Sequence, residues 1–488
     1  MTDPEKDLED RLSELERIAA SLEPSAEARG VLRDAVIAYT EKFIEEIYTL
    51  PAYNVTGDKG REIYASPISE GPMPVDEVLR LFAHAVDRPG LNPASHGHLG
   101  YIPGGGIYAS AVADYLADIT NRYAGIFYGG PGAVRLENML IAWMASLTGY
   151  PAGAGGNLTS GGSIANLIGI VAARDAKGIG SRDVGRSVIY LTDQAHHSVD
   201  KAIRIAGLAE CPLRRIPVTP FHRMDASLLE LTMKKDRASG LRPFLVIGSA
   251  GTTDTGAVDP LANIADLAEA HDCWFHCDGA YGAFFILCSG MNRILSGMER
   301  SDSLVMDPHK GLFLPYGTGA VLVRDRRRMH DSFRYNASYL LDAMSDADEL
   351  SPADLSPELT KHFRGLRLWL PLKIHGLRPF RACLEEKLLL ARYFWEKIRE
   401  CDGFEAGPQP DLSVVTYRYV PKRGNADEFN KVLIEKIQND GRVFLSSTRL
   451  GGNFVLRLAV LAFRTHRWTI DLTLKLLTDY AREIEREF

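Results

Sequence analysis

Short, continuously apolar segments between residues 90 and 375 constrain the fold of this chain more than any other feature. Four of them read SVIYL at 187–191, PFLVIG at 243–248, CWFHC at 273–277 and GAVLV at 319–323. Alanine-rich stretches with helical spacing, such as 261–271, separate several of these segments. Apolar residues that continue without alternation are typical of strands buried on both faces. The pattern therefore predicts an α/β fold in which helices cover a mostly parallel central sheet.

The length of the chain, 488 residues, exceeds what one hydrophobic core usually holds, so we expect several domains. Apolar residues recur every three or four positions from Leu8 to Ile44, and we assign residues 1–85 to an N-terminal helical arm. Because this apolar stripe has no partner in the rest of the pattern, we expect a homodimer in which the arm packs on another surface. Residues 86–375 form the predicted large α/β domain.

Residues 376–488 predict a small C-terminal α+β domain. A helical pattern at 382–399 leads into strand-like segments at 413–419 and 454–460, and an amphipathic helix begins at residue 471. Before this domain, residues 345–357 are acidic, contain proline and lack periodicity. Such a segment predicts an exposed, mobile loop.

Composition and charge exclude several classes of function. The net charge is -7 and no basic block is present, so we expect no nucleic-acid partner. The longest apolar run, 454–463, is broken by Arg457 and is too short to cross a membrane, and the acidic N-terminus lacks a signal-peptide core. Six cysteines do not make a disulfide framework or a zinc site. We expect a reduced, cytoplasmic protein without a metal.

Lys310 follows His309 and a proline, between two apolar runs that should form interior strands. A lysine is ordinarily a solvated surface charge, and a buried ammonium needs a reason. One reason is covalent chemistry, because a lysine that forms a Schiff base must lose its proton, and desolvation favours the neutral amine. Lys310 is therefore a candidate Schiff-base lysine.

Asp278 directly follows the apolar segment 273–277, at the edge where open α/β sheets bind ligands. A carboxylate is costly to bury there unless it meets a cation. A protonated pyridine nitrogen is such a cation, and an aspartate pairs with that nitrogen in enzymes that use pyridoxal phosphate. A helix N-cap or a structural ion pair is the alternative interpretation.

A glycine-rich stretch at 155–163 (GGNLTSGGS) precedes an apolar helical pattern. Free backbone N–H groups and the helix dipole favour a phosphate at such a turn, and the hydroxyl of Ser160 or Ser163 could add a contact. The stretch lacks the lysine of a nucleotide-binding P-loop and the spacing of a dinucleotide fingerprint. A glycine-rich turn before a helix is common, so this signal is weak by itself.

Two further loops follow predicted strands. His196 comes after 187–191, where an imidazole can stack on a cofactor ring or hydrogen-bond its own loop. Thr252 and Thr253 come after 243–248 and offer hydroxyls at the same edge. Each element is ambiguous alone, but together they bring a phosphate turn, an imidazole, an aspartate and a lysine to one edge of the sheet.

With these motifs the chain resembles the group II pyridoxal-phosphate-dependent amino-acid decarboxylases, the family of aromatic-L-amino-acid decarboxylase. The similarity covers nearly the whole chain, and its strongest motifs are DQAHHS at 193–198, GTTDTGAVD at 251–259, HCDGAY at 276–281 and DPHK at 307–310. The resemblance implies a fold-type-I transferase fold with a seven-stranded-type central sheet. It also implies a homodimer in which the N-terminal arm wraps around the partner.

The resemblance further implies what the matching residues do with pyridoxal phosphate. Lys310 would carry the cofactor as a Schiff base, Asp278 would pair with its pyridine nitrogen, and His196 would stack on its ring. The remaining expected cofactor contacts fall on the phosphate turn and on residues lining the ring: Gly162, Ser163, His309, Thr252 and Ala280.

Decarboxylases of this family also return a proton to the substrate from a tyrosine on a loop, and Tyr339 stands at the matching position. The aromatic character of His98, Tyr101 and Phe127 suits an indole or phenol ring, and we expect these three residues to bind the substrate. No arginine is assignable to an acidic side chain. The segment 96–106 looks more like bacterial tryptophan decarboxylases than like the animal enzymes.

The expected reaction is therefore decarboxylation of an L-amino acid, with tryptophan, tyrosine and phenylalanine as candidates. An aldehyde synthase is one alternative, although in that branch phenylalanine typically replaces the tyrosine found here at Tyr339. A carbon–carbon aldehyde lyase shares the T-S-G-G and D-x-H-K patterns, but the chain shows no membrane segment. A non-catalytic cofactor-binding protein is disfavoured by the intact lysine, aspartate and tyrosine.

Overall fold

The computed structural model describes residues 4–334 and 349–487. The chain divides into two compact units, Met1–Asn92 and Pro93–Phe488. The three domain ranges expected from the sequence, 1–85, 86–375 and 376–488, stay predictions. No helix among the described residues is long and apolar enough to cross a membrane.

The first unit is mostly helical. One short antiparallel pair, β1 (Tyr53–Asn54) with β2 (Gly90–Leu91), was not expected, because two-residue strands are too short to show a period. The apolar stripe of α1 is exposed in this chain, with half or more of each side chain of Leu8, Leu12, Leu15 and Ile18 accessible. The helices and helical turns of the unit are α1 (Pro4–Ala19), η1 (Ala20–Leu22), α2 (Ala26–Glu46), η2 (Arg61–Ala65), α3 (Val75–Phe82) and η3 (Ala83–Asp87).

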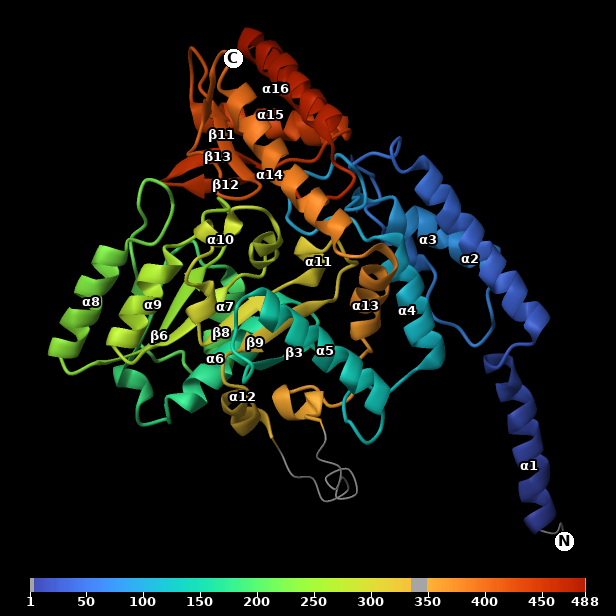
Figure 1. Ribbon diagram of the computed structural model, residues 1–488. Helices are drawn as coiled ribbons and strands as arrows, with labels where there is room; N and C mark the ends of the chain where they lie inside the picture. The colour runs from blue at the N-terminus through green and yellow to red at the C-terminus, as the bar shows by residue number, and fades with distance from the viewer. Residues whose placement is uncertain (1–3, 335–348, 488) are drawn as a thin grey trace. The chain divides into compact units, whose positions relative to one another are not determined.

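A seven-stranded sheet forms the centre of the second unit (Figure 1). Its strand order is β3-β9-β8-β7-β6-β4-β5, and every strand except β9 runs in the same direction. The prediction of a mostly parallel central sheet is confirmed, and the segments 187–191 and 319–323 are strands over those same residues. The strands are β3 (Gly155–Thr159), β4 (Ser187–Leu191), β5 (Leu213–Arg215), β6 (Arg242–Ser249), β7 (Trp274–Asp278), β8 (Ser303–Met306) and β9 (Gly319–Val323).

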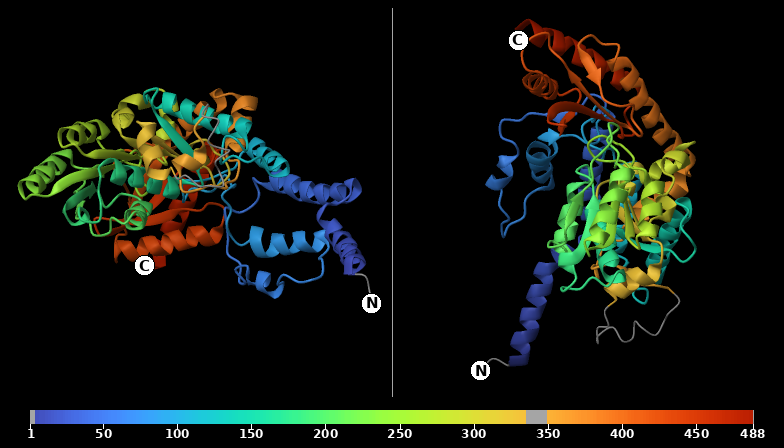
Figure 2. Two further views of the ribbon diagram at one scale, coloured as in Figure 1. Left: turned by 90° about the horizontal axis from the view of Figure 1, so that it is seen from below. Right: turned by 90° about the vertical axis from the view of Figure 1, so that its left-hand side faces the viewer.

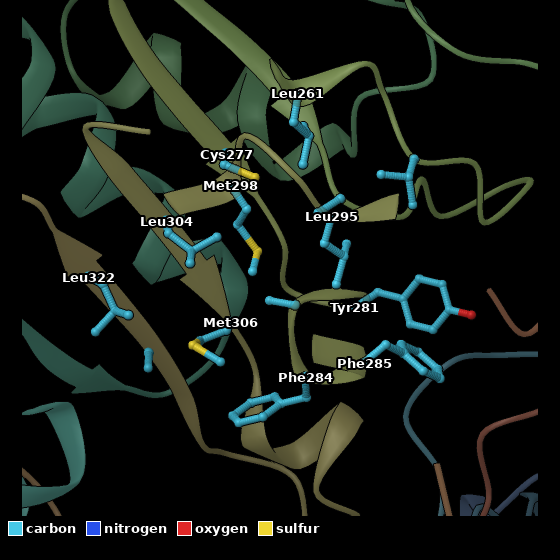
Figure 3. Close-up of a cluster of buried hydrophobic side chains, with 14 of the residues drawn as sticks. Leu261, Cys277, Tyr281, Phe284, Phe285, Leu295, Met298, Leu304, Met306 and Leu322 are labelled. Carbon is cyan, nitrogen blue, oxygen red and sulfur yellow. The ribbon is translucent and has the colours of Figure 1, made fainter. Parts of the chain in front are cut away.

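Both faces of this sheet are buried, as continuous apolar strands require. On β7, Phe275 and Cys277 pack into one cluster, which includes Phe284 and Met306, while Trp274 belongs to the cluster on the other face. Figure 3 shows the first cluster around Cys277, Phe284 and Met306. The helices and turns that border the sheet are α4 (Tyr108–Thr120), α5 (Pro131–Leu147), α6 (Gly162–Ala176), η4 (Val184–Arg186), α7 (His197–Ile205), α8 (Ala226–Ala238), α9 (Leu261–Ala270), η5 (Ala283–Leu287), α10 (Met291–Ile294), η6 (Met298–Arg300), α11 (Pro308–Gly311), α12 (Arg326–Phe333) and α13 (Gly365–His375).

A second, antiparallel sheet lies in the C-terminal part of the chain, in the order β10-β11-β13-β12. Figures 1 and 2 show it, in orange and red, beside the seven-stranded layer. The two layers touch through Tyr281, whose hydroxyl lies 2.7 Å from the Ser413 hydroxyl. The elements are α14 (Arg378–Ile398), β10 (Phe404–Ala406), β11 (Val414–Tyr419), α15 (Ala426–Asp440), β12 (Ser446–Leu450), β13 (Asn453–Ala459) and α16 (Arg467–Glu487).

The expectation of an exposed loop at 345–357 is wrong for its described part, 349–357. The 3-10 turn η8 (Pro352–Leu355) lies within it, and only 3% of Leu355 and of Ser356 is exposed. The backbone N–H of Phe127 donates to the Ser351 hydroxyl, at 3.0 Å. Proline and acidic residues signalled a break in periodicity, but they did not reveal that Leu355 fills a place in the core.

Candidate active site

Five loops meet in one cavity at the edge where β3, β4, β6, β7 and β8 end, because parallel strands bring their carboxyl ends to the same side. The cavity has a volume of about 400 Å³. The residues from these loops that line it include Ser160, Gly161, Gly162, Ser163, His196, Ser198, Ser249, Gly251, Thr252, Thr253, Asp278, Ala280, Tyr281, Asp307, His309 and Lys310. Every residue that the sequence marked as a cofactor contact is thus at the cavity.

The glycine-rich turn leads from β3 into α6. Gly161 has a φ of 154°, which glycine adopts most readily, and a Cβ there would lie 3.3 Å from Cε1 of His309. Gly162 and Ser163 form the start of the helix, where backbone N–H groups lack partners within the helix. The N–H of Gly162 donates to Oδ2 of Asp307, which leaves the N–H of Ser163 and the positive end of the helix dipole for an anion in the cavity.

His196 caps helix α7 with its imidazole. Its Nδ1 accepts the backbone N–H of Ser198 at 3.2 Å and lies 2.7 Å from the Ser198 hydroxyl. Burial lowers the pKa of His196, which favours the neutral ring. Because Nδ1 accepts, the proton of the neutral ring is on Nε2.

Asp278 is the last residue of β7, and only 8% of it is exposed. Its Oδ1 accepts the N–H of Ala280 at 3.1 Å, and its Oδ2 accepts the side-chain amide of Asn166 at 3.1 Å. No lysine or arginine among the described residues forms an ion pair with this carboxylate. A buried carboxylate that lines a cavity without a cation is a place for a cationic ligand.

Lys310 lies in the short helix α11, and its Nζ is 3.4 Å from Oδ2 of Asp307. The same oxygen accepts the N–H of Gly162 at 3.1 Å, so Asp307 connects the lysine to the phosphate turn. His309 donates from Nδ1 to the carbonyl of Thr318 at 2.6 Å, and burial lowers its pKa. The sequence pointed to Lys310 and His309 but gave no role to Asp307.

Of the three residues expected to bind the substrate, only Tyr101 lines the cavity. Its ring lies 5.5 Å from that of Phe444. His98 is fully buried, and its Nε2 donates to the carbonyl of Pro103 at 3.0 Å. Phe127 is also buried and lies under the guanidinium of Arg135. Tyr339, the expected proton donor, lies outside the described residues.

Arg457 lines the cavity although the sequence gave it no role there. It comes from β13 of the C-terminal sheet and is 4% exposed. Its guanidinium donates to the carbonyls of Thr253 and Asp254 and to the Ser446 hydroxyl. A charged residue inside an otherwise apolar strand was the signal in the sequence that could have identified it.

Comparison with known proteins agrees with this geometry. The family model described as "Pyridoxal-dependent decarboxylase conserved domain" matches residues 88–420. An aromatic-L-amino-acid decarboxylase from Bacillus atrophaeus is 36% identical over 77% of this chain and 79% of its own length. Tryptophan decarboxylase 1 from Oryza sativa subsp. japonica is 31% identical over 89% of this chain and 90% of its own. A phenylacetaldehyde synthase from Petunia hybrida is 28% identical over 84% of this chain and 85% of its own.

Solved structures share the fold over almost the entire chain. The structure of Oryza sativa TDC with PLP and tryptamine has a TM-score of 0.89 and 26% sequence identity. The similarity covers 94% of this chain and 99% of that one.

The cavity fits pyridoxal phosphate. The turn at Gly162 and Ser163 suits the phosphate, and Asp278 offers a carboxylate without a cation to the ring nitrogen. The amine of Lys310 lies in the same cavity and is available for the covalent link. Among the described residues, no group of three or more histidine, cysteine, aspartate or glutamate side chains could hold a metal ion.

Proposed function

This chain belongs to the pyridoxal-dependent decarboxylase family and is a pyridoxal-phosphate-dependent lyase; we propose that it converts an aromatic L-amino acid to the amine and carbon dioxide. The observation that carries the proposal is the convergence of Lys310, Asp278 and His196 on a cavity that Tyr101 also lines. The two decarboxylases named above, one for aromatic amino acids in general and one for tryptophan, also support an aromatic substrate.

Each residue at the cavity has a proposed task. When bound, pyridoxal phosphate supplies the electron sink that allows the carboxyl group to leave. Lys310 would hold the cofactor through its amine, which lies in the cavity. Asp278 keeps the ring nitrogen protonated, since a carboxylate stabilises a cation beside it. His196 would cover the ring, and Ser163 would bind the phosphate through its N–H group at the turn that Gly162 begins.

The proposed aromatic specificity rests on the side chains at the mouth of the cavity. Tyr101 lines the cavity and forms an aromatic pair with Phe444, a surface on which an indole or phenol ring can pack. Arg457 is the cation that would serve an acidic substrate. Three of its five N–H groups already bind Thr253, Asp254 and Ser446, so it stabilises the loop after β6 instead.

Tyr339 is the proposed proton donor to the α-carbon after carbon dioxide leaves. A phenol supplies this proton readily, and the amine is then the product. The competing function is that of an aldehyde synthase, which is favoured by the 28% identity of the chain to phenylacetaldehyde synthase from Petunia hybrida. Tyr339 argues for the amine, because phenylalanine typically takes this place in that branch.

We further propose that the enzyme acts as a homodimer in the cytoplasm. The exposed apolar stripe of α1 supports the dimer, since Leu8, Leu12, Leu15 and Ile18 have at least half of their side chains accessible in one chain. Sedimentation of the active enzyme tests this proposal, and a stable, active monomer would contradict it.

The proposed reaction is tested by incubating the holoenzyme with each L-amino acid separately. Carbon dioxide, amine, aldehyde and hydrogen peroxide are measured in the same reaction. We expect carbon dioxide and amine in equal amounts from tryptophan, tyrosine or phenylalanine. Turnover of only acidic or aliphatic amino acids would overturn the aromatic specificity, and aldehyde with peroxide as the main products would favour the synthase.

A further inference from the structure

A buried polar network lies on the face of β7 that is turned toward α6. Side chains alternate along a strand, so Trp274, His276 and Asp278 share this face. All three are at most 8% exposed. Burying polar groups is costly unless every donor and acceptor is paired, and an apolar side chain at 276 would avoid that cost. The cost of burying these polar groups therefore indicates that the network has a function.

Four short contacts connect the indole of Trp274 to the carboxylate of Asp278. Nε1 of Trp274 lies 2.8 Å from the Ser303 hydroxyl, and this hydroxyl lies 2.7 Å from Nδ1 of His276. Nε2 of His276 lies 2.8 Å from Oδ1 of Asn166. The amide nitrogen of Asn166 then lies 3.1 Å from Oδ2 of Asp278.

The direction of every hydrogen bond in this chain of contacts is fixed from its two ends. A carboxylate only accepts, so the NH2 group of Asn166 must face Asp278 and its oxygen must face His276. His276 therefore donates from Nε2 and accepts at Nδ1 from the Ser303 hydroxyl. That hydroxyl accepts from Trp274, whose indole can only donate. Burial lowers the pKa of His276 to about 4, so the ring is neutral, as this arrangement requires.

Asn166 also reaches the second functional side chain of the cavity. Its NH2 group lies 3.1 Å from the Ser198 hydroxyl, which in turn lies 2.7 Å from Nδ1 of His196. The two hydrogens of one amide thus serve Asp278 and Ser198 separately. Through Ser198, Asn166 favours the tautomer of His196 that carries its proton on Nε2.

The packing of α6 against β7 leaves no space beside the imidazole. A Cβ at Gly169, three residues after Asn166, would lie 2.6 Å from Cε1 of His276 and 2.8 Å from its Nδ1. Glycine at this helical position allows the imidazole to approach the helix. The position of His276, and hence that of the Asn166 amide, is consequently sensitive to a single methyl group.

We propose that Asn166, oriented by His276, is a positioning residue that holds the carboxylate of Asp278 in place for the ring nitrogen of the cofactor and sets the tautomer of His196. A carboxylate fixed beside the ring nitrogen stabilises its protonated form, so the amide that fixes the carboxylate favours a protonated ring. The inference rests on the cofactor assigned under the proposed function but not on the identity of the substrate.

The test measures the ring nitrogen directly. Holoenzyme is prepared with 15N-labelled pyridoxal phosphate, and the nitrogen resonance, which differs between the protonated and free ring, is followed with pH. In Asn166→Ala we expect the midpoint of deprotonation to fall by about one pH unit, because the carboxylate of Asp278 is no longer held beside the ring nitrogen. Cofactor affinity should weaken by about tenfold for the same reason.

Asn430→Ala is the matched control. Asn430 is also a fully buried asparagine on a helix, and its side chain bonds the backbone of Tyr419 and Ala426, away from the cavity. Both variants lose stability, but only Asn166→Ala should move the nitrogen midpoint. Equal midpoints in the two variants and the wild type would overturn the proposal and leave Asn166 a structural residue.

Two further pairs of variants keep the test decisive if Asn166→Ala does not fold. Gly169→Ala removes no polar group but displaces the imidazole, so the midpoint should fall, whereas Gly132→Ala, in α5 with open space around it, should leave it unchanged. His276→Gln can donate to Asn166 and accept from Ser303, and it should retain the midpoint that His276→Leu loses. A wild-type midpoint in both Gly169→Ala and His276→Leu would refute the proposed role of His276 in orienting Asn166. A wild type that binds the cofactor without decarboxylating any amino acid would contradict the proposed function alone.

Discussion

Asp278→Asn is the substitution whose consequences the structure defines most sharply. Two N–H donors face the carboxylate, Ala280 at Oδ1 and Asn166 at Oδ2, both at 3.1 Å. The new amide has one oxygen and one NH2 group, so in either orientation its NH2 group faces a donor. Rotation of the Asn166 amide does not relieve this contact, because its oxygen accepts from His276 at 2.8 Å.

Two effects of different size follow. An adjacent opposite charge shifts a pKa by about 1–3 units, so its loss lowers the protonated fraction of the ring nitrogen, and with it kcat/KM, by about 10- to 1000-fold. In the variant, one buried N–H donor is left without an acceptor, and this loss reduces the free energy of unfolding by about 1–3 kcal/mol. The loss of activity should therefore persist under conditions in which the variant is fully folded and loaded with cofactor.

Steady-state kinetics at saturating cofactor measure the first effect, and chemical denaturation of the apoprotein measures the second. Asp236→Asn is the control, since Asp236 is 5% exposed and accepts the Tyr190 hydroxyl and the guanidinium of Arg214, neither of which lines the cavity. Its kcat/KM should stay close to that of the wild type. The reasoning about the carboxylate is refuted if Asp278→Asn retains kcat/KM within about twofold of wild type, or loses no more than Asp236→Asn.

Three further predictions concern the lysine, the tyrosine and the buried imidazole. Lys310→Ala should abolish the visible absorbance of the covalently bound cofactor and reduce turnover by several orders of magnitude; wild-type absorbance in this variant would contradict the assignment. Tyr339→Phe should still release carbon dioxide, but molecular oxygen should then oxidise the decarboxylated substrate, so that aldehyde, ammonia and hydrogen peroxide form at the expense of amine. Amine formation at the wild-type rate would show that another group donates the proton. Burial lowers the pKa of His276 from 6.5 to about 4. Between these two pH values the unfolded chain binds more protons than the folded chain. The free energy of unfolding should therefore fall, by up to about 3 kcal/mol, as the pH decreases through this range. His276→Gln should remove this part of the pH dependence, whereas an unchanged slope would show that other groups cause it.

The sequence by itself determined the class of fold and the chemistry of the cavity. Residues 187–191 and 319–323 are strands as their apolar runs predict, because a strand buried on both faces imposes a local pattern that can be recognised without its neighbours. Lys310 and Asp278 are at the cavity because they directly follow such strands, and parallel strands end at one edge. Their roles with the cofactor stay predictions.

Only the tertiary structure decided which side chains support these residues. Asn166 comes three residues after the glycine-rich stretch 155–163, yet its contacts with His276 and Asp278 join positions 110 and 112 residues apart. Arg457 reaches the cavity from the C-terminal sheet. His98 is fully buried and, unlike Tyr101, does not line the cavity. Periodicity records whether a residue is buried, but not what it touches. What a buried residue touches depends on how α6 packs against β7. The absence of a Cβ at Gly169 leaves room there for the imidazole of His276.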